Sequence, residues 1–191
     1  MPSPIGHAIA GVTAGWLVAG APRGAPSVAR VAGTLSERAP ATFWREAALF
    51  AALGALPDID LLFDAHSGPT HSLGGMAIIG LTALAVARHF RSRRACRLAL
   101  ACAAAYASHV LLDWLGSDAS PPLGVMALWP FSSDYYESDL HVFMAISRRY
   151  YQGWVFVAQN VRAVSLELVI LVPILAVVMR LRHRRSDWSR A

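Results

Sequence analysis

Five long apolar runs constrain the fold of this chain more than any other feature of its sequence. Each run approaches the roughly 20 residues that cross a bilayer as an α-helix. The runs cover residues 5–21, 44–63, 72–87, 98–115 and 163–179. The second run is interrupted by Asp58 and Asp60, so its apolar part could instead form a buried or re-entrant helix. We therefore predict an all-α polytopic membrane bundle of about five transmembrane helices, of which the second can be partial.

The composition favours a membrane protein over other classes. Hydrophobic residues make up 55% of the chain and charged residues 15%, whereas soluble domains carry about 25% charged residues. The apolar content excludes a disordered chain. A soluble helical bundle is disfavoured because no faces of Glu, Lys or Gln accompany the apolar runs. The two cysteines, Cys96 and Cys102, indicate neither a disulfide framework nor a metal knuckle.

Residues 1–191 are predicted to form a single membrane domain with three distinct connecting or terminal segments. Residues 22–43 are rich in Ala, Pro, Gly and Ser, which predicts a flexible cytoplasmic loop. Residues 116–162 combine aromatic and acidic side chains, which predicts an outer interfacial loop, because amphipathic rings gather where membrane meets water. Residues 180–191 are predicted to form a basic cytoplasmic tail.

The arginines predict how the chain is oriented. The formal net charge is +5, and all 17 basic residues are arginine. All but Arg148, Arg149 and Arg162 fall in three segments, which follow the first, third and fifth apolar runs. Because basic loops remain in the cytoplasm, we predict a bacterial inner-membrane protein with its N-terminus outside and its C-terminus inside. The arginines then determine topology, and no nucleic-acid partner is expected.

Histidines and carboxylates gather at the opposite, outer ends of four runs. Taken singly, each has a plainer interpretation: an HxxxD pair is often only hydrogen-bonded, and an Asp-x-Asp is often a turn. Together they favour a metal site, because imidazole and carboxylate suit Zn²⁺, and also Mn²⁺ or Fe²⁺. Bridging carboxylates allow two ions. The predicted ligands of one or two ions are His7, Asp58, Asp60, His71, His109 and Asp113, with His66 and His141 as accessory candidates.

The same residues stand in motifs that resemble a known family, the bacterial membrane-bound metal-dependent hydrolases whose namesake is under LexA control. The motifs are Gly6-His7, Leu56-Pro57-Asp58-Ile59-Asp60, Gly68-Pro69-Thr70-His71-Ser72 and His109-Val110-Leu111-Leu112-Asp113. That family is distantly similar to zinc-dependent phospholipase C and the single-strand-specific nucleases, so the resemblance implies a helical metallohydrolase. The family's usual His-Arg-Gly is His66-Ser67-Gly68 here.

These observations predict a metal-dependent hydrolase that acts on a lipid or lipid-linked phosphoester at the outer membrane face. Asp58 or Asp60 is expected to act as general base if it is not a ligand. Trp114 and Trp129 near the site favour membrane lipids as partners. The alternative is a non-catalytic membrane protein whose His/Asp site is structural or handles ions or protons. No sequence pattern specifies an oligomeric state.

Overall fold

The computed structural model describes residues 1–20, 41–63, 67–118 and 121–188, with side chains described as far as Arg182. Within these residues the chain forms five α-helices and three short 3₁₀ helices. Pairing between extended segments is limited there to two isolated β-bridges. The all-α prediction is therefore confirmed for the described chain.

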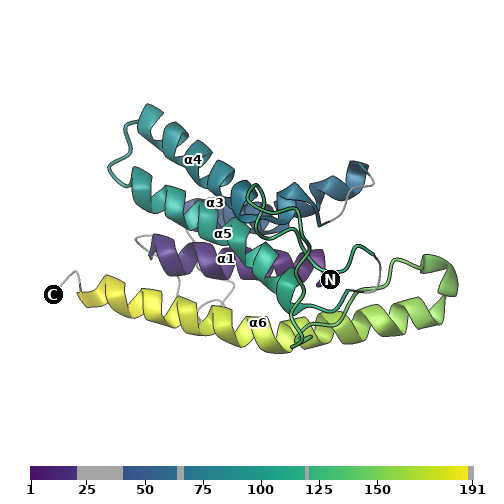
Figure 1. Cartoon of the computed structure of the whole chain (residues 1–191). Helices are drawn as coiled ribbons and strands as arrows, with labels where there is room; N and C mark the ends of the chain where they lie inside the picture. Colours follow the sequence, from purple (N-terminus) through teal and green to yellow (C-terminus); the bar gives the residue numbers. More distant parts are fainter. Residues whose placement is uncertain (21–40, 64–66, 119–120, 189–191) are drawn as a thin grey trace.

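Helix α5 (Ala95–Leu115) lies at the centre of the bundle (Figure 1). Helices α1 (Pro4–Ala19), α3 (Ala41–Ala55) and α4 (Leu73–His89) each pack against it, and α3 also packs against α1. The long helix α6 (Trp154–Trp188) runs along the other side of α1. Helix α1 is thus held between α3, α5 and α6.

Glycines bring α1 and α3 into backbone contact. A Cβ atom on Gly11 would overlap the Phe50 carbonyl oxygen and lie 2.8 Å from the Gly54 Cα. The fully buried Phe50 ring fills the space beside Gly15. Small residues are the usual means by which helices approach closely in lipid. The two helices therefore pack closely because Gly11, Gly15 and Gly54 have no side chains to separate their backbones.

Local sequence signals set the helix ends that matter for the site. Ser3 caps α1 by accepting a hydrogen bond from the Gly6 N–H at 3.1 Å, and Pro4 occupies the first helical position. Helix α3 ends at Ala55, just before Pro57, because proline lacks the N–H that an α-helix needs. The chain continues as the 3₁₀ helix η1 (Leu56–Phe63).

Two helices in the described chain are long and apolar enough to cross a membrane: α5, and the part of α6 from Trp154 to Arg182. Helices α1 and α4 are apolar but shorter. Helix α3, with 15 residues, is about 22 Å long, whereas the hydrocarbon core is about 30 Å thick. A helix stands at each predicted run, but five full crossings stay a prediction.

The segment between α5 and α6 differs from the expected loop at its C-terminal end. Helix α6 begins at Trp154, earlier than residue 163, because residues 154–162 lack Gly and Pro and continue the helical pattern. The predicted basic tail is helical as far as Trp188. Most of the predicted loop 22–43 lies outside the described residues.

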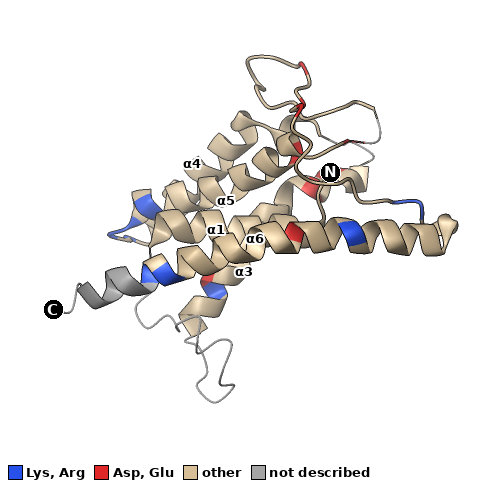
Figure 2. Ribbon diagram, turned by 90° about the horizontal axis from the view of Figure 1, so that it is seen from below, with Lys and Arg blue, Asp and Glu red and all other residues tan. Residues whose placement is uncertain are grey.

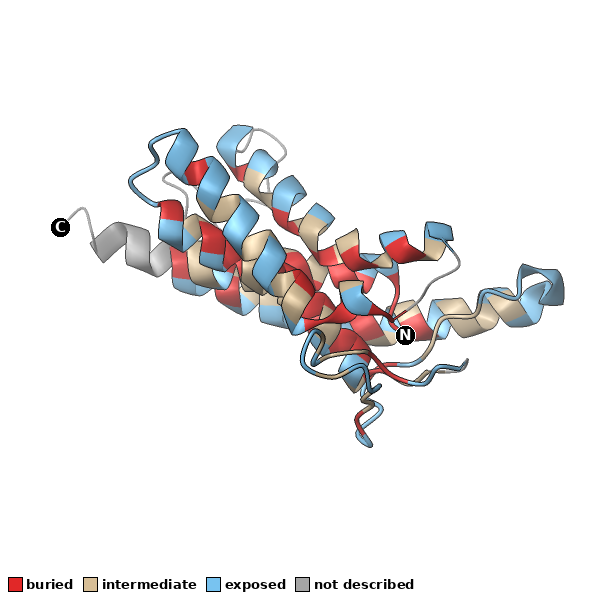
Figure 3. Ribbon diagram, turned by 45° about the horizontal axis from the view of Figure 1, so that its top comes forward, coloured by how far each residue is buried: buried red, intermediate tan, exposed pale blue. Residues whose placement is uncertain are grey.

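Charge varies along the bundle axis, and burial varies from the inside of the bundle to its surface. Arginines gather mainly at one end of the helices and acidic side chains mainly towards the other (Figure 2). The outer surfaces of the helices are largely exposed (Figure 3), and many of the exposed side chains are large and apolar, such as Ile78, Leu81 and Leu100. Lipid-facing helices carry such surfaces.

The arginine-rich end contains a polar cluster around the C-terminus of α1, in which Arg182 is buried. The Arg182 guanidinium donates to the Gly20 carbonyl, lies 4.9 Å from the centre of the Trp16 ring and pairs with Glu46 at 3.8 Å. Arg97 Nε donates to the Val18 carbonyl at 3.0 Å. Cations beside helix carbonyls are stabilising, so this end of the bundle is tied together by α5 and α6.

Candidate metal centre

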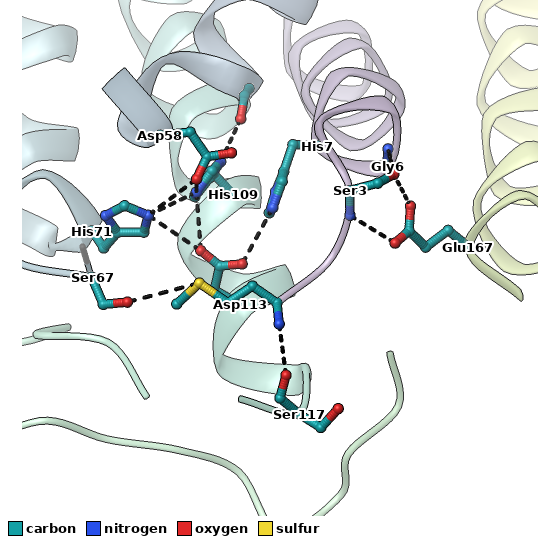
Figure 4. A network of polar contacts seen from close by, with 12 residues as sticks. Ser3, Gly6, His7, Asp58, Ser67, His71, His109, Asp113, Ser117 and Glu167 are labelled. Atoms are coloured by element: carbon teal, nitrogen blue, oxygen red, sulfur yellow. Dashed lines mark hydrogen bonds and ion pairs between the residues drawn. The ribbon is translucent and has the colours of Figure 1, made fainter. Parts of the chain in front are cut away.

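Four elements bring their polar side chains to one point at the other end of the bundle (Figure 4). His7 comes from the second turn of α1, Asp58 from η1, and His71 from the end of the short 3₁₀ helix η2 (Pro69–His71). His109 and Asp113 stand one turn apart on α5 and face the same way. The convergence predicted from the separate motifs is therefore present in the structure.

Three of these side chains, His71, His109 and Asp113, present ligand atoms at tetrahedral spacing, and Asp58 lies slightly farther out. His71 Nε2 lies 3.0 Å from His109 Nε2, and these atoms lie 3.4 and 3.0 Å from Asp113 Oδ2. Asp58 Oδ1 is 3.8 Å from His71 Nε2 and 3.7 Å from His109 Nε2. Tetrahedral zinc with bonds of about 2.0–2.1 Å holds its ligand atoms about 3.3 Å apart. The donor set therefore matches the size of a zinc site.

Hydrogen bonds behind the two imidazole rings direct their Nε2 atoms to this point. His109 Nδ1 lies 2.7 Å from the Gly54 carbonyl oxygen and must donate to it. His71 Nδ1 lies 3.2 Å from Asp60 Oδ2, which also accepts from the Thr70 hydroxyl at 2.8 Å. A protonated Nδ1 leaves a lone pair on Nε2, and metal-binding histidines are commonly held this way.

The arrangement leaves an electrostatic demand that a cation would meet. The Nε2 atoms of His71 and His109 face each other, so two lone pairs meet unless a proton or a cation lies between them. Neither oxygen of Asp113 receives a hydrogen bond within the described chain, although the residue is only 3% exposed. A buried carboxylate without a donor or a cation is costly. The donor chemistry therefore fits a divalent metal.

His7 lies on the far side of Asp113 from this set. Its Nε2 is 3.2 Å from Asp113 Oδ1, and its ring stacks on that of His109 with centroids 3.7 Å apart. The two oxygens of Asp113 thus face different histidines. Two overlapping groups could each hold an ion: His7 with His109 and Asp113, and Asp58 with His71 and His109.

The charge on His71 depends on its neighbouring carboxylates. Burial lowers the pKa of His71, but hydrogen bonds to Asp58 and Asp60 outweigh burial and raise the pKa to about 9. Without a metal, His71 is therefore protonated at neutral pH and supplies the positive charge. A metal ion must displace that proton in order to bind Nε2.

Asp58 connects the centre to the outside. Its side chain is 20% exposed, whereas His71 and His109 are fully buried. Ile59 and Leu62, on the same 3₁₀ helix, are exposed by 48% and 78%. Since a 3₁₀ helix repeats every three residues, these two side chains share one outward ridge. The 3₁₀ helix that carries Asp58 therefore also presents an exposed apolar ridge.

The remaining predicted residues have separate positions. Asp60 lies behind His71 and contacts Nδ1, the nitrogen that points away from the centre. His141 has a half-exposed side chain, pairs with Glu137 at 3.7 Å and belongs to neither metal-competent group. His66 lies outside the described residues. The accessory role of His141 thus gains no geometric support.

Two supporting groups were missed by sequence reasoning. The Gly54 carbonyl that orients His109 left no signal, because backbone acceptors are invisible in a sequence. Glu167 of α6 is fully buried and accepts hydrogen bonds from the N–H and hydroxyl of Ser3, which caps α1 just before His7. The sequence did contain a signal for this pair. Ser3-Pro4 before an apolar run is typical of a helix start, and a lone Glu within a membrane span needs a polar partner.

Comparisons with known proteins place the chain in a family. No curated protein and no solved structure matches it. The sequence model of the YdjM inner membrane protein family matches residues 1–185, nearly the whole chain. The chain therefore belongs to the YdjM inner membrane protein family, which agrees with the inner-membrane location expected from its apolar runs.

Proposed function

We propose that this protein is a membrane-bound, metal-dependent hydrolase that cleaves a lipid or lipid-linked phosphoester at the outer face of the inner membrane. One observation carries the proposal: the buried Nε2 atoms of His71 and His109 converge with Asp113 Oδ2 at distances of 3.0–3.4 Å, and Asp58 Oδ1 lies 3.7–3.8 Å from both nitrogens. Three ligands leave the fourth position of a tetrahedral ion open to water, beside Asp58. Zn²⁺ fits this set best, and Mn²⁺ or Fe²⁺ would also accept it.

A divalent ion held by these residues would polarise a phosphoryl oxygen and make a water acidic near neutral pH. The residues of the chain supply the rest. His71 and His109 are held in one tautomer by Asp60 and Gly54, and so remain aimed at the ion. Asp113, with oxygens towards both His7 and His109, can bridge to a second ion.

Asp58 is placed to handle the proton of the reaction. It alone among the converging side chains is markedly exposed, so water and substrate approach beside it. In the proposed hydrolysis a water oxygen bonds to phosphorus, Asp58 accepts the water proton, and the phosphorus–oxygen ester bond breaks. The departing alkoxide then takes up that proton. Asp60 is buried behind His71 and acts as its positioning residue.

The surroundings favour a lipid over a soluble substrate. Ile59 and Leu62 are exposed on the same 3₁₀ helix as Asp58. Trp114 at the end of α5 is also exposed, as is Tyr135 in the segment between α5 and α6, residues 116–153, which we call the outer segment. Tryptophan and tyrosine settle at the headgroup level of a membrane. A phosphate-bearing headgroup at that level would lie beside Asp58.

Elemental analysis and phosphoesterase assays of the purified protein test the proposal. Wild type is expected to hold zinc or another divalent metal and to hydrolyse a phospholipid in mixed micelles. His71→Ala and His109→Ala are expected to lose both metal and activity, whereas His141→Ala, with a half-exposed ring outside the centre, retains them. Full metal content and activity in both alanine variants would refute the proposal.

A structural metal site is the second candidate, because the same ligands join α1, α5, η1 and η2. It predicts a different result from the same experiments. Wild type would hold its metal but hydrolyse no phosphoester, and metal removal would lower the unfolding temperature without any loss of turnover.

A further inference from the structure

An apolar groove lies between α4 and α5, on the side of α5 next to the metal centre. Its volume is about 390 Å³, within the range of small-molecule sites. The lining is almost entirely apolar, with Leu73 and Met76 from α4, Val110, Leu111 and Trp114 from α5, and Tyr136 from the outer segment. A groove of this size can hold part of a hydrocarbon chain.

The groove has a fixed outer wall. The N–H groups of Leu73 and Gly74 donate to the carbonyls of Ala127 and Trp129, each at 2.9 Å. The Trp129 ring lies directly against Gly74, where any side chain would clash with it. These contacts hold the outer segment on the first turn of α4, so the groove is preformed.

The polar chemistry of the lining disfavours an extended peptide as the occupant. Ser72 is its main polar side chain, and the Ser72 hydroxyl already donates to the Pro69 carbonyl and accepts from the Gly75 N–H. An extended peptide laid in the groove would leave its own N–H and C=O groups without partners. A hydrocarbon chain has no such groups to satisfy.

The groove and the metal centre share the same stretches of chain. Ser72 follows the ligand candidate His71, Val110 follows His109, and Trp114 follows Asp113. On α5, successive residues are about 100° apart around the axis, so the centre and the groove occupy neighbouring faces of the same two turns. A chain in the groove would hold its headgroup at the level of the centre.

The outer surfaces of the two helices indicate where the occupant comes from. Ile78 and Leu81 of α4 and Leu100 of α5 are each more than half exposed. In an inner membrane protein these surfaces meet lipid. Leu111 lines the groove, is itself 51% exposed, and lies about three turns from Leu100 on the same face of α5. The lining of the groove thus reaches a surface that faces acyl chains.

We propose that this groove is the acyl-chain subsite of the enzyme and binds one chain of its lipid substrate. This inference rests on the proposed function, because it names the part of the substrate that the metal centre does not contact. It predicts that long-chain substrates have a lower KM than short-chain analogues, whereas kcat is the same for both.

Photocrosslinking in vesicles tests the subsite. Full-length protein is reconstituted with phosphatidylcholine containing a phosphatidylglycerol probe that carries a diazirine in one acyl chain. Labelling of Met76 and Leu111 is expected to saturate as the probe fraction rises, whereas labelling of Leu81 stays proportional to it. Ala107→Phe, which fills the groove wall, should lower groove labelling at least fivefold, and Leu100→Phe on the exposed face should not.

The outcomes separate this inference from the proposed function. Saturable groove labelling that persists in His109→Ala supports the subsite, whether or not the wild type hydrolyses phosphoesters. Labelling of Met76 that is proportional to the probe, or unchanged by Ala107→Phe, overturns the subsite even if a short-chain phosphoester is hydrolysed. If Ala107→Phe fails to fold, Met76→Trp fills the groove from α4, and labelling of Leu111 is then expected to fall at least fivefold; unchanged Leu111 labelling overturns the subsite.

Discussion

The two ends of α1 carry polar clusters of opposite design. At the C-terminal end, Arg182 and Arg97 meet helix carbonyls, and Arg182 also meets Glu46. At the N-terminal end, His7 lies among imidazoles and carboxylates whose lone pairs face one another. The first cluster contains permanently charged arginines, whereas the positive charge of the second is a proton on His71 that a metal ion can displace. The contrast distinguishes a cluster that holds helices together from one that binds a ligand.

Removing the charge of Asp113 gives the sharpest test of that contrast. Asp113→Asn keeps the shape of the side chain but removes the anion that faces His7, His71 and His109. Metal affinity, measured by competition with a chelating dye, should fall by about 100-fold or more, because a lost ligand costs at least as much as a lost supporting group. Wild-type affinity in Asp113→Asn would place the metal elsewhere.

The matching change at the other end should affect stability alone. Arg182→Met removes the buried guanidinium from the Gly20 carbonyl and the Trp16 ring. It also removes the cation beside Glu46, whose side chain is 36% exposed, so loss of that pair adds only about 1 kcal/mol or less. The unfolding temperature in detergent should drop while metal content per folded protein stays at the wild-type value. Loss of metal at unchanged stability would erase the distinction between the two ends.

Asp60 should show an intermediate effect, because it acts through His71. Asp60→Asn removes the carboxylate at His71 Nδ1, and loss of such a group typically lowers metal affinity by about 10–100-fold. Asp134→Asn, an exposed acid of the outer segment, is the control. Equal affinities for the two variants would remove Asp60 from the centre.

Acid should release the metal. The pKa of His71 without metal is about 9, so its proton competes with the metal at every lower pH. Affinity should therefore rise with pH up to about 9, by roughly tenfold per unit for one displaced proton. A chelator titration between pH 6 and 9 measures the slope. A flat profile would mean that His71 is not a ligand.

The smallest effect is expected at Glu167, which supports α1 without touching the centre. Glu167→Gln keeps one acceptor for Ser3 but loses the charge, so the unfolding free energy should fall by about 1 kcal/mol. In the double variant Ser3→Ala should add only the loss of the Gly6 cap, about 1 kcal/mol, because its contact with Glu167 is already weakened. Fully additive losses would show that the two residues act separately.

Much of this architecture was accessible from sequence because it depends on local patterns. The apolar runs located all five described α-helices, and the i, i+4 spacing of His109 and Asp113 placed both side chains on one face. The convergence of His7, Asp58 and His71 on that pair followed from orienting the helices by their arginines. Family membership confirms the inner membrane, while the orientation stays a prediction.

Other features could not be predicted, because they depend on packing between distant segments. The roles of Asp58 and Asp60 remained interchangeable on sequence until the 3₁₀ helix placed one beside Nε2 of His71 and the other beside Nδ1. The groove beside α4 depends on where the outer segment folds back, and its backbone contacts at Gly74 leave no side-chain signal.

Gly54 limits how this protein could be engineered. Its missing side chain lets α1 approach α3, and its carbonyl oxygen accepts a hydrogen bond from the Nδ1–H of His109. Replacing helical glycines by alanine is a common route to thermostability. At this position the added methyl group would push against the His7 carbonyl and turn the acceptor away from His109. A search for sturdier variants should therefore leave this glycine untouched, since stability and metal affinity would decline there together.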